Sequence, residues 1–281
     1  MTLKNIEVFI DATPEGERRA DYAATLAHRC GAHLAGIHVI SASRPESRAD
    51  AFAVGEKAIR SSLAWQKAAD EAVTATVRRR FEAISAKRDV NSEFREIRRG
   101  GPNEDLILNS LHSDLVVIGQ RELNELPGYL SAERLLLASG TPILVVPSGW
   151  TSETIGRKIL VGWNASREAR RAVTDALPFL VAASSVTILV VDPDKRADRH
   201  GEEPGADIAL HLARHGVHVE VERVSSHGAP VADIILTHAA DRGVDLIVIG
   251  AYSHARSVEV VFGGVTRTLL KEAPIPVLMS R

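Results

Sequence analysis

The chain has 281 residues, 45% of them hydrophobic, and a formal net charge of −2. That length suits one large domain or two of ordinary size, with enough apolar residues for a packed core in each. The near-neutral charge argues against nucleic acid or an anionic membrane as a partner. The apolar runs are only as long as strands and are broken by charges, so no membrane-spanning segment is expected.

The start of the chain and its single cysteine indicate where the protein works. The opening MTLKNIEVFIDA leads straight into a strand, without the basic and then apolar pattern of an export segment. Cys30 cannot form an internal disulfide and falls on the apolar side of a predicted helix. We interpret it as a small buried hydrophobic residue, consistent with a reducing, cytoplasmic location.

The first half predicts alternating strands and helices. A strand at residues 6–10 ends at Asp11, and the helix after it stops at Gly31. A strand at 33–40 precedes an extended helical region, about residues 50–88, in which apolar residues recur every four positions. The remaining predicted elements are a charged strand (SEFREI), a helix from Pro102, the strand DLVVIG, a further helix and the strand ILVV.

The second half repeats this order. After the strand ILVGW, Asn164 stands where Asp11 stood, and Ser166 is the predicted N-cap of the next helix. Pro178 in that helix predicts a kink or an early end. The remaining predicted elements are the strand VTILVV, a half-buried strand from Val217, a helix after Pro230, the strand DLIVIG, a helix from Gly264 and the strand IPVLMS.

The near-copies DLVVIG and DLIVIG indicate a duplicated α/β unit. We therefore predict one domain over residues 1–148 and a second over 157–281, joined by the linker SGWTSETIG. Strands that alternate with helices predict parallel pairing with right-handed crossovers. Sheets of this kind bind ligands at the carboxyl ends of their strands.

The segment after DLIVIG carries the residues best suited to a ligand. Gly250 ends the strand, and Gly263 and Gly264 stand directly before a helix. Glycines let a ligand approach the backbone. The unpaired N–H groups and the dipole of the helix suit phosphate oxygens. Arg267, on the first turn, adds positive charge.

This layout resembles the universal stress protein family, in which G-x2-G-x9-G-[S/T] holds the phosphates of ATP. The resemblance covers essentially the whole chain as a tandem pair. It implies an α/β fold of two Rossmann-like domains, each a five-stranded parallel sheet of order 3-2-1-4-5. It also implies a site for ATP, ADP or AMP, with or without Mg²⁺. The implied site residues are Gly162 and Asn164 near the base, Val191 in the adenine pocket, and Gly250, Ser253, Gly263, Gly264, Val265 and Thr266 around the ribose and phosphates. His254, inside the same loop, is a further candidate for contact with a ligand.

The second half departs from the family pattern at three positions. Ser253 replaces the second glycine, Gly264 replaces the Ser or Thr, and Asn164 replaces an acidic residue. The backbone amides remain, so we expect weakened binding. The first half has Glu122 at the second glycine position, Glu125 nearby, and no Gly-Gly or Gly-Ser pair before its helix. These carboxylates would repel a triphosphate, and we predict that the first half does not bind ATP.

Several of these residues have a plainer interpretation. Gly263-Gly264 can be a tight turn into a helix, and Asn164 and Asp11 can simply cap the helices that follow. His211 and His215 have the spacing of zinc ligands, but no carboxylate or cysteine completes a set, so a solvated helix face is favoured. The run Arg78-Arg79-Arg80 is interpreted as a solvent face.

No catalytic constellation emerges, so we expect a non-enzyme with at most weak ATP hydrolysis. The leading hypothesis is a cytoplasmic stress-response sensor or regulator that binds an adenine nucleotide in its second half. The alternatives are an interaction scaffold that binds no nucleotide and a nucleotidyl-transfer enzyme. By the resemblance, ILVV and PVLMS pair within the chain as an internal pseudo-dimer, and the long helix is a surface for a protein partner or a second chain.

Overall fold

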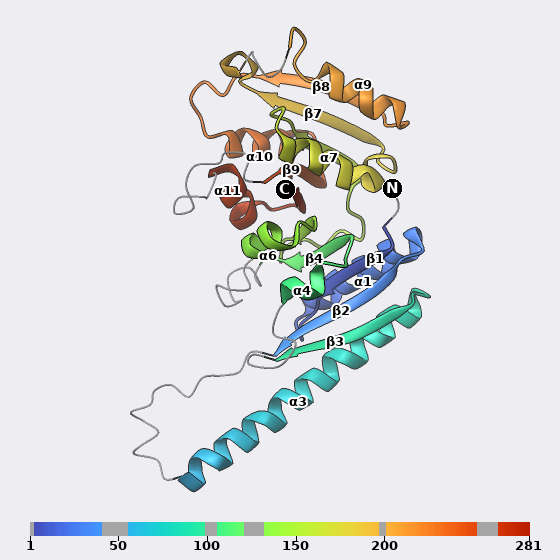
Figure 1. The fold of residues 1–281 in the computed structure, drawn as a ribbon, viewed down its shortest axis with the longest axis vertical. Helices are drawn as coiled ribbons and strands as arrows, with labels where there is room; N and C mark the ends of the chain where they lie inside the picture. Colours follow the sequence, from blue (N-terminus) through green and yellow to red (C-terminus); the bar gives the residue numbers. More distant parts are fainter. Residues whose placement is uncertain (1–2, 41–55, 99–105, 121–131, 197–200, 252–263) are drawn as a thin grey trace.

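The computed structural model describes residues 3–40, 56–98, 106–120, 132–196, 201–251 and 264–281 (Figure 1). Its strands are β1 (Asn5–Phe9), β2 (His33–Ile40), β3 (Ser92–Arg98), β4 (Leu115–Gly119), β5 (Ile143–Val146), β6 (Lys158–Gly162), β7 (Ser185–Val191), β8 (Val219–Val224), β9 (Leu246–Gly250) and β10 (Val277–Ser280). Its helices are α1 (Pro14–Cys30), α3 (Glu56–Lys87), α4 (Leu106–Ser110), α6 (Ala132–Ser139), α7 (Arg167–Leu180), the 3-10 helix η2 (Pro193–Arg196), α9 (Ala206–Arg214), α10 (Val231–Asp241) and α11 (Gly264–Glu272).

The strands form one sheet in the order β3-β2-β1-β4-β5-β10-β9-β6-β7-β8. Within each half the pairing is parallel and the order is 3-2-1-4-5, which confirms the predicted fold class. The two halves join where β5 pairs with β10 in antiparallel register, with Leu144 opposite Leu278. The expected pairing of these strands within the chain is therefore observed, and it merges the two units into a continuous sheet.

Apolar side chains cover both faces of this sheet, as expected for parallel strands flanked by helices. One cluster joins residues of α1, α3, α7 and α9 to the strands, and the other joins residues of α6, α10 and α11. Each cluster contains residues of both halves. The core is thus shared across the β5–β10 junction.

Local sequence signals set the ends of the two helices that follow β1 and β6. The side chain of Thr13 accepts a hydrogen bond from the Gly16 amide, and that of Ser166 accepts one from the Ala169 amide. Gly31 ends α1 with φ of 58°, in the left-handed region where glycine is favoured. Pro178 lies inside α7, which ends two residues later at Leu180. The helix therefore ends within a turn of the proline, consistent with the predicted early end, because Pro178 cannot donate to the carbonyl of Thr174.

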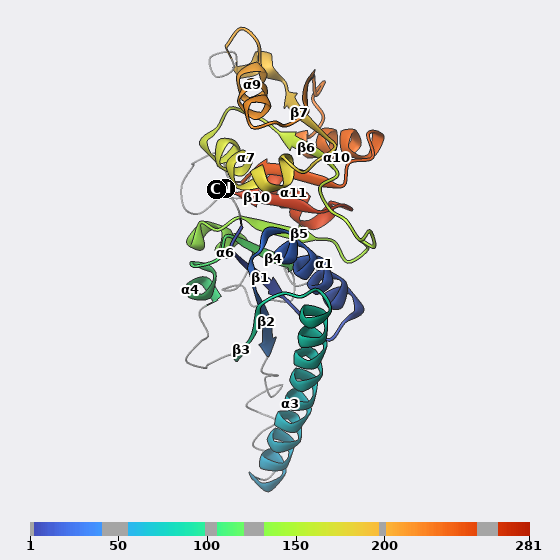
Figure 2. The same ribbon diagram turned by 90° about the vertical axis from the view of Figure 1, so that its right-hand side faces the viewer.

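Helix α3 accounts for most of the extended region predicted over about residues 50–88; residues 50–55 lie outside the described residues. Its C-terminal half packs on β2, where the ring of Phe81 lies over Gly36. Its N-terminal half extends away from the sheet (Figure 1 and Figure 2), and Trp65 there is 76% exposed. None of the described helices is both long and apolar enough to cross a membrane.

Two expectations about side chains need correction. Arg78 and Arg80 do not form a purely solvated face: Arg78 donates to Glu96 at 2.8 Å and lies over the ring of Phe94, and Arg80 reaches the turn after β1. Helical periodicity predicts which face of the helix these arginines lie on, but it does not predict which residues of other elements they contact. Cys30 is half-buried rather than buried, and its burial raises the pKa of the thiol.

Candidate functional site

The second half has its topological switch point between β6 and β9, because β7 and β8 extend the sheet from one side of β6 and β9 lies on the other. Gly162 ends β6 opposite Ile249 of β9 and Leu189 of β7. Val191 ends β7, half-buried, and Gly250 ends β9. The structure therefore brings Gly162, Val191 and Gly250 to the same edge of the sheet.

Packing explains two of the predicted site glycines. A Cβ at Gly162 would lie 3.0 Å from Ile249 Cγ2, and one at Gly250 would collide with the backbone of Ala169 at the start of α7. Packing therefore excludes a side chain at Gly250 whether or not a ligand binds, and it admits one at Gly162 only if the Ile249 side chain shifts by a few tenths of an ångström. A sequence pattern alone does not show whether a glycine is present because of such packing or because a ligand approaches the backbone there.

Gly264 is different. It begins α11, is exposed, and among the described residues no atom outside its own helix lies within 4 Å of the place a Cβ would take. Val265 is half-buried and packs against the second core cluster, and Thr266 is 4% exposed in the first turn. The predicted site residues Ser253, His254 and Gly263 lie outside the described residues, as do Glu122 and Glu125. Open space beside the first amides of a nine-residue helix is the geometry that an anion requires.

Asn164 and Asp11 make the same local contact in the two halves. The Asn164 Oδ1 accepts from the Ser166 amide at 3.2 Å, and the Asp11 Oδ1 accepts from the Thr13 amide at 2.7 Å. Neither residue is the N-cap, because Ser166 and Thr13 hold that position. Each instead orients the cap residue two positions later, in a turn typical of Asn and Asp.

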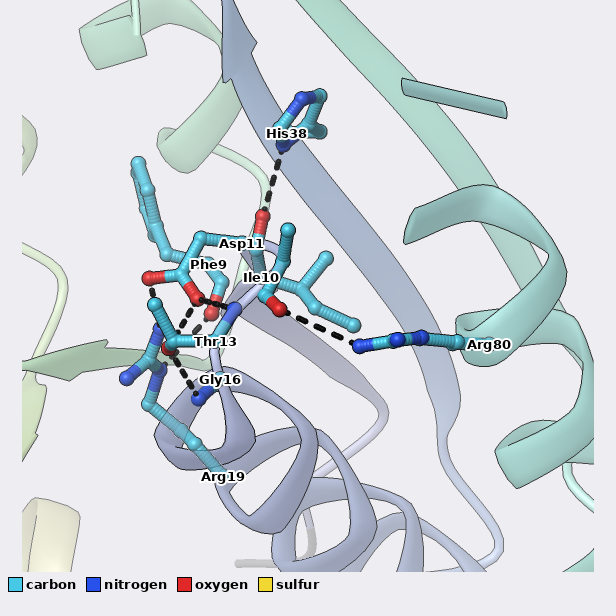
Figure 3. A network of polar contacts seen from close by, with 9 residues as sticks. Phe9, Ile10, Asp11, Thr13, Gly16, Arg19, His38 and Arg80 are labelled. Carbon is cyan, nitrogen blue, oxygen red and sulfur yellow. Dashed lines mark hydrogen bonds and ion pairs between the residues drawn. The ribbon is translucent and has the colours of Figure 1, made fainter. Parts of the chain in front are cut away.

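The turn after β1 differs from its counterpart in the second half by its neighbouring arginine and histidine side chains (Figure 3). Arg19 Nε donates to the carbonyl oxygen of Phe9 at 2.8 Å, and His38 Nδ1 donates to that of Ile10 at 3.0 Å. Arg80, from α3, donates to the carbonyl oxygen of Ala12 at 3.2 Å. Three basic side chains from three elements thus bind the backbone that leads from β1 into α1.

Arg19 lies at the carboxyl ends of β1 and β4, the two neighbouring strands at the topological switch point of the first half. It is 5% exposed, its NH2 lies 3.8 Å from Asp11 Oδ2, and its guanidinium would collide with a Cβ on Gly119. Arg19 follows Asp11 by eight residues, and the residue eight after Asn164 is Ala172. The second half therefore has no guanidinium at this position.

Sequence reasoning missed Arg19, His38 and Arg80. One signal was present for Arg19: it extends the apolar stripe of Ala23, Leu26 and Cys30 by one turn, and a charge on a buried stripe is uncommon unless it is paired. Asp192, after Val191, was also missed. It has φ of 50° and accepts hydrogen bonds from the Ser226 amide and hydroxyl, at 2.7 and 2.6 Å.

The histidine pair belongs to no metal site in the part of the chain that the structure describes. His211 and His215 contact each other edge to face, with ring centroids 4.8 Å apart. Partial desolvation and nearby positive charges lower the pKa of His211. Among the described residues, no three His, Cys, Asp or Glu side chains gather so as to hold a metal.

Comparison with known proteins agrees with this architecture. A sequence model described as the universal stress protein family matches residues 2–147 and again 156–281. A universal stress protein of Synechocystis sp. is 27% identical over 177 residues, which are 60% of this chain and 58% of that protein. The chain therefore aligns with little more than half the length of that curated relative.

Solved structures share the tandem fold. A universal stress protein from Archaeoglobus fulgidus superposes with a TM-score of 0.68 at 17% identity, covering 99% of this chain and 96% of that one. A putative universal stress protein from Pseudomonas aeruginosa gives 0.60 at 13% identity, covering 99% and 93%. Because both halves match the family and the matched residues span most of the chain, this protein belongs to the universal stress protein family.

Proposed function

We propose that this protein binds an adenine nucleotide, ATP in the first instance, at the carboxyl ends of β6 and β9, and that binding regulates its response to stress. The observation that carries the proposal is Gly264, which begins α11 and has, among the described residues, open space beside its Cα. The helix dipole and the amides of that turn suit phosphate oxygens. Val191 offers an apolar surface for the base, and Asn164 a side-chain amide.

The proposal assigns nucleotide to the second half alone. In the first half, the guanidinium of Arg19 lies buried at the carboxyl ends of β1 and β4. The carbonyl oxygens of the β1–α1 turn already accept hydrogen bonds from basic side chains. A ligand there would have to displace the buried, charge-assisted hydrogen bond that Arg19 makes, which is costly to break. The second half has Ala172 where Arg19 stands, and so lacks this guanidinium at the equivalent position of its helix.

Titration calorimetry with ATP and Mg²⁺ tests the proposal on the full chain. Gly264→Val adds a branched side chain in open space, so the fold is retained while the approach of a phosphate to the helix amides is blocked. We expect the affinity to fall by about tenfold or more, since charge-assisted hydrogen bonds contribute about 1.5–3 kcal/mol. Gly149→Val is the matched control, because Gly149 also has open space around it and lies far along the chain.

A second candidate is an interaction scaffold without nucleotide, which the exposed Trp65 on the projecting half of α3 favours. No heat of binding up to millimolar ATP, or an affinity that Gly264→Val leaves unchanged, would reject the nucleotide site and favour this scaffold.

A further inference from the structure

We propose that a groove between α1 and α7 binds an amphipathic carboxylate, a molecule with an apolar chain and an anionic head. The groove lies between the last turns of these helices and the segment that joins the two halves, and its volume is about 410 Å³. Gly156 on its wall lies two residues before β6, so the groove is at the amino edge of the sheet. It is therefore separate from the proposed nucleotide site, which lies at the carboxyl edge.

The first observation is the apolar lining of the groove. The nearly buried part of this lining is formed by Leu26, Ile155, Leu177 and Phe179. Val181, at the end of α7, lines the same groove and is 52% exposed. Sites for small molecules are mostly apolar, measure about 300–1,000 Å³ and often lie between domains. The groove has these properties, and an apolar chain along it would cover Val181.

The second observation concerns the polar part of the lining. It consists of Arg29, Cys30 and His215, and no Asp or Glu of the described residues lines the groove. Arg29 forms no ion pair and no side-chain hydrogen bond with any residue that the structure describes. Its guanidinium is therefore available to a carboxylate from outside the chain.

The third observation is the sign of the charges that act on Cys30. Burial raises the pKa of its thiol, whereas Arg29 and Lys4 both favour the thiolate. Two positive charges thus reach into this part of the groove. They favour a negatively charged group on a ligand as they favour the thiolate.

The helix ends at the groove do not reverse this preference. The C-terminal ends of α1, α7 and α9 meet there, and each carries about half a negative charge. The full charges of Arg29 and Lys4 exceed their sum. Amides of the following turns already donate to carbonyl oxygens at all three ends, those of Ala27, Leu177 and Leu212.

These observations define how the ligand would lie. Its carboxylate would pair with Arg29, and its chain would cover Leu177 and Val181. Cys30 follows Arg29 on the same wall, so a bound ligand would shield the thiol from solvent. Because Leu177 and Arg29 belong to different halves, the ligand would also link the two halves.

The test uses the single cysteine of the full chain as a reporter. Cys30 is half-buried, so a maleimide should label it slowly, and a ligand in the groove should slow the labelling further. We expect octanoate to protect Cys30 at about a fifth of the concentration that 1-octanol requires. The two probes differ in charge, and an exposed ion pair contributes up to about 1 kcal/mol, which is about fivefold.

Arg29→Gln should raise the protective concentration of octanoate about fivefold and leave that of 1-octanol unchanged, with each rate compared to that of the same variant without ligand. Arg167→Gln is the matched control and should change neither, because the Arg167 side chain is 98% exposed at the other end of α7.

A second measurement locates the ligand directly. Crystals of the unaltered protein soaked with 8-bromooctanoate should show an anomalous bromine peak next to Val181. No protection by octanoate, equal protection by the two probes, an octanoate effect that survives in Arg29→Gln, or a bromine peak outside the groove would each overturn the proposal.

Discussion

Gly264 stands at the position where the family pattern has Ser or Thr, and its surroundings leave room for that side chain. In the part of the chain that the structure describes, no atom beyond its own helix lies within 4 Å of an added Cβ, and the backbone there is not left-handed. Restoring the hydroxyl therefore brings no steric cost. It adds a donor at the start of α11, where a phosphate oxygen is proposed to lie.

We predict that Gly264→Ser raises the affinity for ATP about fivefold, the equivalent of about 1 kcal/mol for one additional hydrogen bond. Calorimetry on the two proteins measures it, and Gly149→Ser serves as the control. A weaker affinity in Gly264→Ser would place the phosphates elsewhere.

Glu7 is a buried carboxyl group in the centre of β1. It is 0% exposed and accepts from the hydroxyls of Ser110 at 3.2 Å and Ser113 at 3.1 Å. Desolvation raises its pKa from 4.5 to about 7, although both serines and Arg95 favour the charged form. The residue at the same place in β6 is Leu160, which shows that the fold does not need a carboxyl there.

The stability of the protein should therefore depend on pH through Glu7. The folded state holds the proton more tightly than the unfolded state, so this contribution is complete below pH 4.5 and is lost as the pH rises through about 7. Glu7→Gln keeps the shape and removes the charge. We expect it to match the parent protein at pH 5 and to be up to about 3 kcal/mol more stable at pH 8, measured by urea denaturation. An equal difference at both pH values would contradict this explanation.

At the scale of elements, the contact between Phe81 of α3 and Gly36 of β2 is one of those that hold α3 to the sheet. Gly36 of β2 lets the ring of Phe81 approach, and a Cβ there would lie 2.6 Å from a ring carbon. Phe81 in turn contacts Phe94 of β3, with centroids 5.8 Å apart. This stack anchors the C-terminal half of the helix and lets the other half project.

Gly36→Ala should destabilise the protein by about 1–3 kcal/mol, because the added methyl group overpacks this contact. Combining it with Phe81→Leu should cost less than the sum of the single changes, since the smaller side chain makes room. Gly149→Ala, in open space, is the control. Additive losses in denaturant unfolding would show that the two residues do not share this contact.

At the scale of the whole molecule, the β5–β10 pair and the shared cores make the two halves one unit. Leu278 of β10 is fully buried and lies opposite Leu144 of β5. Each core cluster includes side chains of both halves. The two halves should therefore unfold together.

Leu278→Ala should lower the free energy of unfolding by about 2–5 kcal/mol, the usual range for a buried leucine. The transitions seen by circular dichroism and by tryptophan fluorescence should still coincide. Leu210→Ala, at a side chain that is 53% exposed, should change stability by no more than about 0.5 kcal/mol. Two separate transitions, with only one shifted by Leu278→Ala, would show that the halves are independent.

The sequence by itself determined the repeated unit, the alternation of strands and helices, the end of α1 at Gly31 and the N-cap Ser166 of α7. These features depend on periodicity, caps and turn residues, which neighbours in the chain define. The strand order was implied by the resemblance to the family rather than by these local signals. The resemblance also selected Gly162, Val191, Gly250 and Gly264 as site residues, but it did not show that a side chain at Gly250 would collide with the backbone of α7.

Only the tertiary structure decided which distant atoms meet. Arg19, His38 and Arg80 come from three elements, and their convergence on the carbonyls of the β1–α1 turn depends on the packing of α1, β2 and α3. The burial of Glu7 has the same origin. The energy of a charge or a donor is set by what surrounds it in space, and composition and spacing along the chain do not specify those surroundings.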